Sequence, residues 1–187
     1  MFNPTMDKLI LIADNHWTTV DGIQMFLHEK FGPVEIEVVT TCSEIMDRLK
    51  GNRFTHLIME LNFDDDTSAS IIPKIKPLFP SLKVAIFSSL DEDIKEHLRD
   101  YGIYHFISKH STKEEIRNGF SLFLSGQLPI GSLKKVSKSD HRVKLSPREL
   151  EVLALIYANK SNDEIAHKLH IKKNSVSTMK YRIVSKR

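Results

Sequence analysis

The feature that most constrains the fold is the alternation of short apolar runs with amphipathic segments across about the first 125 residues. Five apolar runs of strand length occur, at residues 8–13, 34–39, 54–61, 82–88 and 104–108. Between them, apolar side chains recur at spacings of three and four, which is typical of one face of a helix. Strands that are apolar throughout predict a parallel sheet with helices on both faces. We therefore expect an α/β fold with a five-stranded, doubly wound parallel sheet, whose functional groups gather at the carboxyl ends of the strands.

Two prolines complicate the helix between the third and fourth strands. Pro73 and Pro77 lie four residues apart in this segment. Either proline can begin a helix, but both inside one helix would interrupt its hydrogen-bond ladder. We predict that the third helix is short, kinked or late-starting.

The C-terminal part of the sequence carries the signals of a helix-turn-helix. Residues 146–149 (SPRE) form a capping box, with Pro147 at the first helical position, where its missing N–H costs little. A second capping box, residues 161–164 (SNDE), begins fifteen residues after the first. A third helix is expected to run to the chain end from a cap at Asn174 or Ser175. Short helices joined by tight turns, the last one polar and basic, predict a small all-α helix-turn-helix domain.

Charge is distributed unevenly along the chain. Residues 1–132 hold 13 Lys and Arg against 19 Asp and Glu, a net charge of −6, whereas residues 133–187 hold 14 against 5, a net charge of +9. A basic segment on an acidic body indicates contact with a polyanion such as nucleic acid. A solvated basic surface that binds nothing in particular explains the charge alone equally well.

Composition excludes several classes of protein. A hydrophobic fraction of 41% and a charged fraction of 27% are ordinary for a globular protein. No apolar run approaches the ~20 residues that cross a bilayer, and residues 1–8 (MFNPTMDK) do not resemble a secretory signal, so we expect no membrane partner. Cys42 is the single cysteine, which excludes an intramolecular disulfide and fits a cytoplasmic location.

Two segments of the chain resemble known families. Residues 145–183 (LSPRELEVLALIYANKSNDEIAHKLHIKKNSVSTMKYRI) closely resemble the DNA-binding domain of LuxR-type transcription factors, and the first 125 residues resemble a response-regulator receiver domain. Together they resemble a NarL/FixJ-type response regulator. The resemblance implies a receiver-like domain at residues 1–126, a linker at 127–144 and a helix-turn-helix domain at 145–187. It also implies that the receiver controls DNA binding through phosphorylation of one aspartate.

The positions that match the family's phosphorylation site are only partly those of the family. They are Asp14, Asn15, Glu60, Ser88, Phe106 and Lys109. Asn15 stands where the family has a second magnesium-binding acid, and Glu60 stands where it has the phosphoacceptor aspartate. The hydroxyl, the aromatic switch residue and the lysine are retained as Ser88, Phe106 and Lys109.

These departures predict a degenerate, phosphorylation-independent receiver. Phosphoryl transfer needs a carboxylate held in line beside a metal, and Mg²⁺ prefers carboxylate oxygens. Three interpretations remain open: a buried polar cluster that holds loops together, a Glu60 carboxylate that imitates phosphorylated aspartate toward Lys109 and Ser88, or a pocket that senses a small molecule or partner. We expect no cofactor, no bound metal and no enzymatic activity.

The last helix supplies the expected DNA contacts. They are Lys172, Lys173, Asn174, Ser175, Ser177, Thr178, Lys180, Tyr181 and Arg182. Met179 lies three residues after Val176 and four before Ile183, a spacing that favours packing over base reading. The predicted function is sequence-specific regulation of transcription on double-stranded DNA. The alternative is a protein-interaction or ligand-sensing receiver that regulates another transcription factor.

We also expect a homodimer, because helix-turn-helix proteins commonly bind two half-sites one helical turn apart. The resemblance places the dimer contact on the receiver face formed by residues 91–101, 104–108 and 112–125. The family's DNA-binding domain has a fourth helix, often used for dimerisation, whereas this sequence ends at Arg187. Either the sequence is a piece of a longer chain or that helix is missing, in which case dimerisation falls to the receiver.

Overall fold

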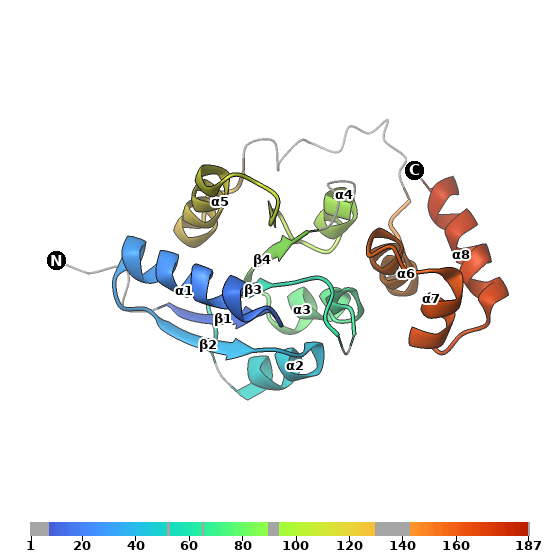
Figure 1. Cartoon of the computed structure of the whole chain (residues 1–187), viewed down its shortest axis with the longest axis horizontal. Helices are drawn as coiled ribbons and strands as arrows, with labels where there is room; N and C mark the ends of the chain where they lie inside the picture. Colours follow the sequence, from blue (N-terminus) through green and yellow to red (C-terminus); the bar gives the residue numbers. More distant parts are fainter. Residues whose placement is uncertain (1–7, 52, 65, 90–93, 130–142, 187) are drawn as a thin grey trace.

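The computed structural model describes residues 8–51, 53–64, 66–89, 94–129 and 143–186. Its centre is a five-stranded, all-parallel sheet with the strand order β2-β1-β3-β4-β5 (Figure 1). The strands are β1 (Leu9–Ala13), β2 (Glu35–Val39), β3 (His56–Met59), β4 (Lys83–Ser88) and β5 (His105–Ser108). The predicted doubly wound fold is confirmed.

Helices cover both faces of the sheet, and a separate group of helices follows at the C-terminal end of the chain. They are α1 (Trp17–Phe31), α2 (Cys42–Gly51), the short 3₁₀ turn η1 (Ser68–Ser70), α3 (Ile72–Leu78), α4 (Ile94–Arg99), α5 (Lys113–Ser125), α6 (Pro147–Tyr157), α7 (Asn162–Lys168) and α8 (Lys173–Ser185). Ile10 and Ile12 of β1 face α1 and α5, whereas Leu11 and Ala13 face the α2 side. Because both faces are buried, the strands need apolar residues at every position.

Helix α3 is short, as its prolines predict. It has seven residues, with Pro73 in the first turn and Pro77 inside the helix. Pro77 donates no backbone hydrogen bond, and the helix ends one residue later at Leu78. The predicted start of the following helix at Asp91 lies outside the described residues, which resume at Ile94.

Both predicted capping boxes are present. Ser146 and Glu149 cap α6, and Ser161 and Glu164 cap α7, each with side-chain and backbone bonds in both directions. The predicted cap of the last helix was wrong. Helix α8 begins at Lys173 after Lys172, whose side chain makes no capping bond, so Asn174 and Ser175 lie inside the first turn. Without a side-chain cap, tertiary packing of its buried face (Val176 and Ile183) is what holds this helix in place.

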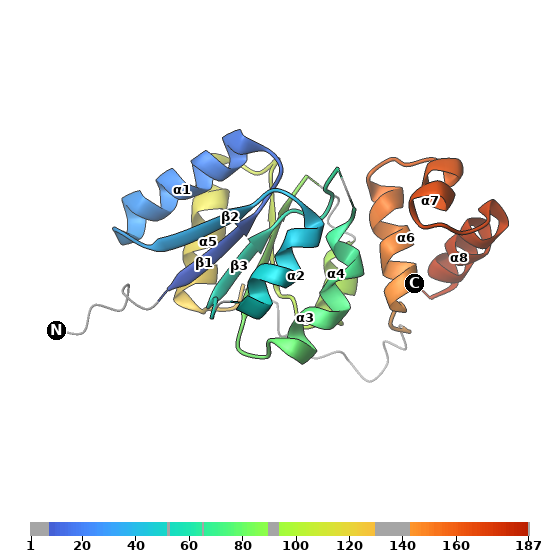
Figure 2. The ribbon, with the colours of Figure 1, turned by 90° about the horizontal axis from the view of Figure 1, so that it is seen from below.

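The helical domain packs on the receiver-like domain through α6, which lies against η1 and α4 (Figures 1 and 2). Tyr101 Oη donates to the Leu145 carbonyl oxygen at 2.5 Å. Lys144 Nζ donates to the Asp100 carbonyl oxygen at 2.7 Å and lies 3.8 Å from the centre of the Tyr101 ring. Buried apolar residues of both domains form one continuous cluster. In the described ranges, no helix has the length and apolar character required to span a membrane.

Candidate functional site

Four of the predicted site residues meet at the carboxyl edge of the sheet. Asp14 follows β1, Glu60 follows β3, Ser88 ends β4 and Lys109 follows β5. Asp14, Glu60 and Ser88 are buried, at 2%, 5% and 1% exposure. Backbone bonds from Glu60 N to Ala13 O and from Lys109 N to Ser88 O, both 2.9 Å, tie neighbouring strand ends together. The parallel topology therefore concentrates two carboxylates, an ammonium and a hydroxyl in one place.

Lys109 bridges the two carboxylates. Its Nζ lies 2.7 Å from Asp14 Oδ2 and 2.6 Å from Glu60 Oε2. The other oxygen of Asp14 accepts from the backbone N–H of His16 at 2.9 Å. The other oxygen of Glu60 accepts from Leu61 N at 2.6 Å and from Ser88 Oγ. Every carboxylate oxygen of the pair therefore has a donor, which stabilises the two buried charges.

Asn15 and Phe106 lie outside this hydrogen-bonded cluster of four. Asn15 Oδ1 is buried and has no hydrogen-bond partner within the described part of the chain. Phe106 is partly buried against the apolar core, and Lys95 Nζ lies 5.0 Å from its ring centre. The structure thus joins Asp14, Glu60, Ser88 and Lys109, and leaves the other two predicted residues at the periphery.

The cluster does not fit the magnesium ion that the receiver resemblance implies. The ammonium of Lys109 already bridges the oxygens of Asp14 and Glu60, and a neutral amide at Asn15 replaces the second acid. Across the described ranges, no group of three or more His, Cys, Asp and Glu side chains is arranged to hold a metal. The donor set therefore favours the internal ion pair over a hard divalent cation.

Two hydroxyls that sequence reasoning missed connect Glu60 to the helical domain. Ser68 Oγ donates to the Glu60 carbonyl oxygen at 2.8 Å, and Thr67 Oγ1 donates to the Leu61 carbonyl oxygen at 2.9 Å. Both side chains are fully buried, and η1, which contains Ser68, packs against α6. The only signal for them was a pair of hydroxyl residues between an acidic loop and an apolar run.

The predicted DNA-contact residues lie on an accessible face. The exposed members are Lys172, Lys173, Asn174, Ser177, Thr178, Tyr181 and Arg182, while Ser175 and Lys180 are partly exposed. Met179 is partly buried against the core, as its spacing predicts. Helix α6 contacts the receiver-like domain, whereas α8 lies on the far side of the helical domain (Figure 2). The docked receiver therefore leaves the basic face of α8 uncovered.

One further contact fixes α8 within its domain. Lys186 Nζ lies 2.6 Å from Glu149 Oε2, so the end of α8 is bound to the cap of α6. Burial of Glu149 opposes its ionisation, but hydrogen bonds from Lys186 and Ser146 outweigh burial and hold its pKa below the ordinary value. Sequence reasoning counted Lys186 only toward the basic charge of the segment.

Comparison with known proteins defines the class. The response regulator receiver domain model matches residues 10–120, and the model of bacterial regulatory proteins of the luxR family matches residues 143–186. The chain belongs to the response regulators, with a receiver domain followed by a LuxR-type DNA-binding domain. It is therefore a DNA-binding regulator of the two-component class, a family of transcriptional regulators rather than enzymes.

Among its relatives are two staphylococcal proteins. The oxygen regulatory protein NreC of Staphylococcus epidermidis (strain ATCC 12228) is 28% identical over 95% of this chain and 89% of that protein. The response regulator protein VraR of Staphylococcus epidermidis (strain ATCC 35984) is 29% identical over 95% and 88%. The fold matches that of RcsB from Salmonella enterica serovar Typhimurium bound to promoter rprA, with a TM-score of 0.67, 20% identity, and coverage of 96% of this chain and 90% of that one. A structure of two RcsB dimers on two parallel DNAs matches with a TM-score of 0.72, 24% identity, and coverage of 96% and 92%.

Proposed function

We propose that this regulator binds DNA without phosphorylation of its receiver, because Glu60 takes the place of a phosphorylated aspartate. The observation that carries the proposal is the Glu60 carboxylate, which bonds to Lys109 through one oxygen and to Ser88 through the other. Glutamate extends its charge one methylene further than aspartate, toward these two partners. Charge-assisted bonds of this kind contribute ~1.5–3 kcal/mol each, and ~1.4 kcal/mol shifts an equilibrium about tenfold.

The same geometry disfavours phosphoryl transfer to Glu60. A phosphoacceptor needs an oxygen available for in-line attack and a metal that neutralises the incoming phosphoryl group. Both oxygens of Glu60 are already bonded, and Lys109 bridges the two carboxylates where a cation would bind. A phosphodonor therefore finds neither a free nucleophile nor a metal site.

The proposal includes a route from Glu60 to the DNA-binding domain. The Glu60 carbonyl oxygen is bonded to Ser68 of η1, and η1 packs on α6. A change at Glu60 that moves its backbone also moves the surface on which α6 rests. The route supports regulation by the arrangement of the loop between β3 and η1.

The finer assignments belong to the same proposal. The nine predicted residues from Lys172 to Arg182 contact double-stranded DNA, and two copies of the chain bind two half-sites in the cytoplasm. The functional division at residues 1–126, 127–144 and 145–187 is proposed with them. The accessible basic face of α8 supports the DNA contacts.

The deciding experiment compares the full chain with Glu60→Gln and Glu60→Asp on a duplex selected by the wild-type protein from random DNA. Glu60→Gln keeps the size of the side chain and removes its charge, so DNA affinity should fall about tenfold. Acetyl phosphate should change neither the mass nor the DNA affinity of wild type. The exposed Asp47→Asn is the matched control. A wild-type mass gain of one phosphoryl group that tightens DNA binding overturns the proposal.

The DNA face has a separate test. Lys180→Gln and Arg182→Gln should each weaken DNA binding and reduce the slope of log affinity against log salt by about one, because each removes one phosphate contact. Lys74→Gln, on the exposed side of α3, should leave both quantities unchanged. Light scattering should find two chains per duplex. Unchanged slopes in both α8 variants would place the DNA contact elsewhere.

A further inference from the structure

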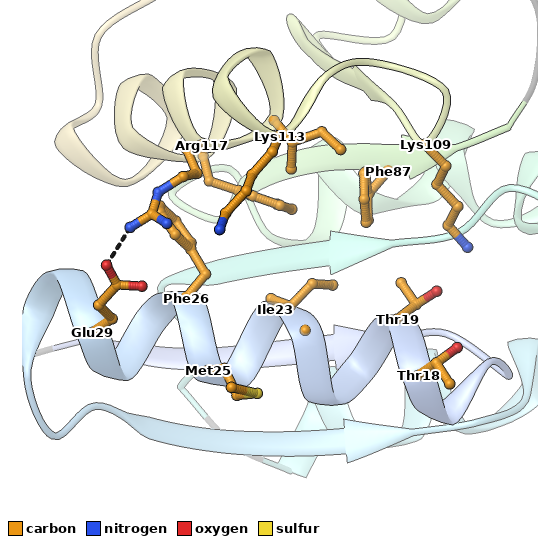
Figure 3. Close-up of a pocket in the computed structure, with 13 residues that line it drawn as sticks. Thr18, Thr19, Ile23, Met25, Phe26, Glu29, Phe87, Lys109, Lys113 and Arg117 are labelled. Carbon is orange, nitrogen blue, oxygen red and sulfur yellow. Dashed lines mark hydrogen bonds and ion pairs between the residues drawn. The ribbon is translucent and has the colours of Figure 1, made fainter.

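A cavity of about 550 Å³ lies between α1 and α5 (Figure 3). It shares Lys109 with the cluster of Asp14, Glu60, Ser88 and Lys109, and the other three residues do not line it. Its floor is apolar and includes Ile23, Phe26, Phe87 and Phe120. The volume is within the range of small-molecule sites, which are mostly apolar with a few polar groups.

Gly22 is an exposed glycine at the edge of this cavity. It lies within α1 and lines the cavity, and a Cβ atom at this position would meet no atom within 4 Å. Glycine is a poor helix former, so a glycine inside a helix needs a reason. Packing explains the glycine at position 119 of α5, because a Cβ there would approach Ile107 Cγ1 to 2.9 Å. Packing gives no such reason for Gly22, whereas its missing side chain leaves room in the cavity.

The charges around the cavity favour an anion. Lys113 extends from α5 toward α1, and in the described part of the chain it has no ion-pair partner (Figure 3). Glu29, the one carboxylate among the described residues of the lining, is paired with Arg117. Lys109 lines the cavity on the side where Thr18 and Thr19 lie. A bound anion would therefore meet an uncompensated ammonium and no free carboxylate.

We propose that this cavity binds a small amphipathic acid, with an apolar chain or ring and one carboxylate. The apolar part lies on Phe26, Phe87 and Phe120, and the carboxylate pairs with Lys113. The hydroxyls of Thr18 and Thr19, on the same side of the cavity as Lys109, are available as additional donors.

Such a ligand would supply the input that phosphorylation supplies elsewhere, a step that rests on the proposed function of Glu60. Lys109 lines the cavity and also bridges Asp14 and Glu60. Lys109 Nζ lies 5.7 Å from the centre of the Phe87 ring, on which the apolar part of the ligand rests, so a ligand that fills the cavity displaces Lys109 and weakens the Glu60 pair. Ligand binding therefore lowers DNA affinity, since the Glu60 arrangement is the one that favours DNA.

The binding test uses octanoate and its neutral counterpart octanol as probes, titrated calorimetrically into the full chain without DNA or phosphodonor. Octanoate should bind one per chain. Lys113→Gln should weaken octanoate about fivefold and leave octanol unchanged, as expected for one partly exposed charge pair. The matched control is Lys74→Gln, an exposed lysine outside the cavity.

Gly22→Leu tests whether the ligand occupies the space beside Gly22 in the cavity. Leucine is a good helix former, so the variant should fold, fill the cavity and abolish binding of both probes, whereas Gly22→Ala should retain binding. Octanoate binding that survives both Gly22→Leu and Lys113→Gln overturns the proposal. A lack of octanoate binding to the wild-type chain also overturns it. If Gly22→Leu is then a monomer where wild type is a dimer, a second copy of the chain covers the cavity instead. Binding is measured without DNA, so its failure is distinct from a failure of the Glu60 proposal.

The regulatory step is read from DNA affinity. Saturating octanoate should lower the DNA affinity of wild type and have no effect on Glu60→Gln, which has already lost the charge pair. Octanol, which lacks the charge that pairs with Lys113, should lower the DNA affinity of wild type only at a higher concentration and should not affect Glu60→Gln. An equal response in wild type and Glu60→Gln overturns the step through Lys109, even where octanoate binds.

Discussion

His56 is a buried ionisable residue whose protonation affects the stability of the fold. It lies in β3 and is 2% exposed. The centre of its ring lies 5.2 Å from the centre of the Phe123 ring in a T-shaped arrangement, and its Nδ1 lies 2.8 Å from Thr55 Oγ1. Burial, reinforced by the nearby charges of Lys83 and Lys8, lowers the pKa of His56 to about 4. The native protein therefore holds this side chain neutral, whereas the unfolded chain protonates it near its ordinary value of 6.5.

The free energy of unfolding should fall as the pH decreases from about 6.5 to about 4, because in this range His56 binds a proton in the unfolded state but stays neutral in the native state. The full loss from this residue is about 3 kcal/mol. Urea unfolding at pH 7 and pH 4.5 measures it. His56→Leu should remove the part of the dependence that comes from His56 and leave the part from His105, whose pKa is also lowered by burial, while the exposed His110→Gln should keep the whole dependence. An unchanged pH profile in His56→Leu would assign the dependence to other groups.

Individual site residues could be predicted where strand topology alone brings them together. Asp14, Glu60, Ser88 and Lys109 each follow or end a recognisable strand, so a parallel sheet places them at one edge. The roles of the buried Thr67 and Ser68 hydroxyls could not be predicted, because they depend on how an irregular loop folds back on β3.

Helix boundaries follow the sequence where the signal is local. The capping boxes of α6 and α7 need only residues three apart, so the sequence predicts them correctly. The start of α8 could not be predicted in this way, because no side chain caps it and packing of Val176 and Ile183 holds the helix. The two glycines inside α1 and α5 differ in the same way: local helix propensity decides the effect of a side chain at Gly22, whereas packing decides it at Gly119.

Gly22→Ala and Gly119→Ala should have opposite effects on stability. In α1, alanine gains helix propensity and meets no neighbour, so the free energy of unfolding should rise by about 0.5–1 kcal/mol. In α5, the new methyl group would overlap Ile107, which is buried, and the strain should outweigh the gain by about 1 kcal/mol. Urea unfolding of both variants measures the difference. Stabilisation by both would show that α5 moves freely away from β5.

The two domains meet through side chains that look ordinary in the sequence. Tyr101 follows α4 and Lys144 precedes α6, and neither position has a pattern that predicts a contact. In the structure, Tyr101 bonds to Leu145 and stacks under Lys144. Burial and the nearby carboxylates of Asp100 and Glu149 raise the pKa of Tyr101 above its ordinary value. Tyr101 and Lys144 therefore add polar contacts, which only the folded chain brings together, to the apolar packing of α6 on η1 and α4.

Removing Tyr101 should separate the domains and uncouple DNA binding from the receiver. Tyr101→Ala loses the bond to Leu145 and the stacked Lys144, so the radius of gyration measured by X-ray scattering should increase. If α6 loses its contact with η1 in this variant, Glu60→Gln should leave DNA affinity unchanged, although it should lower affinity in the docked protein. Leu78→Ala, at an exposed residue of the same domain outside the predicted dimer face, is the control. If Glu60→Gln lowers affinity equally with and without Tyr101, the signal does not pass through this contact.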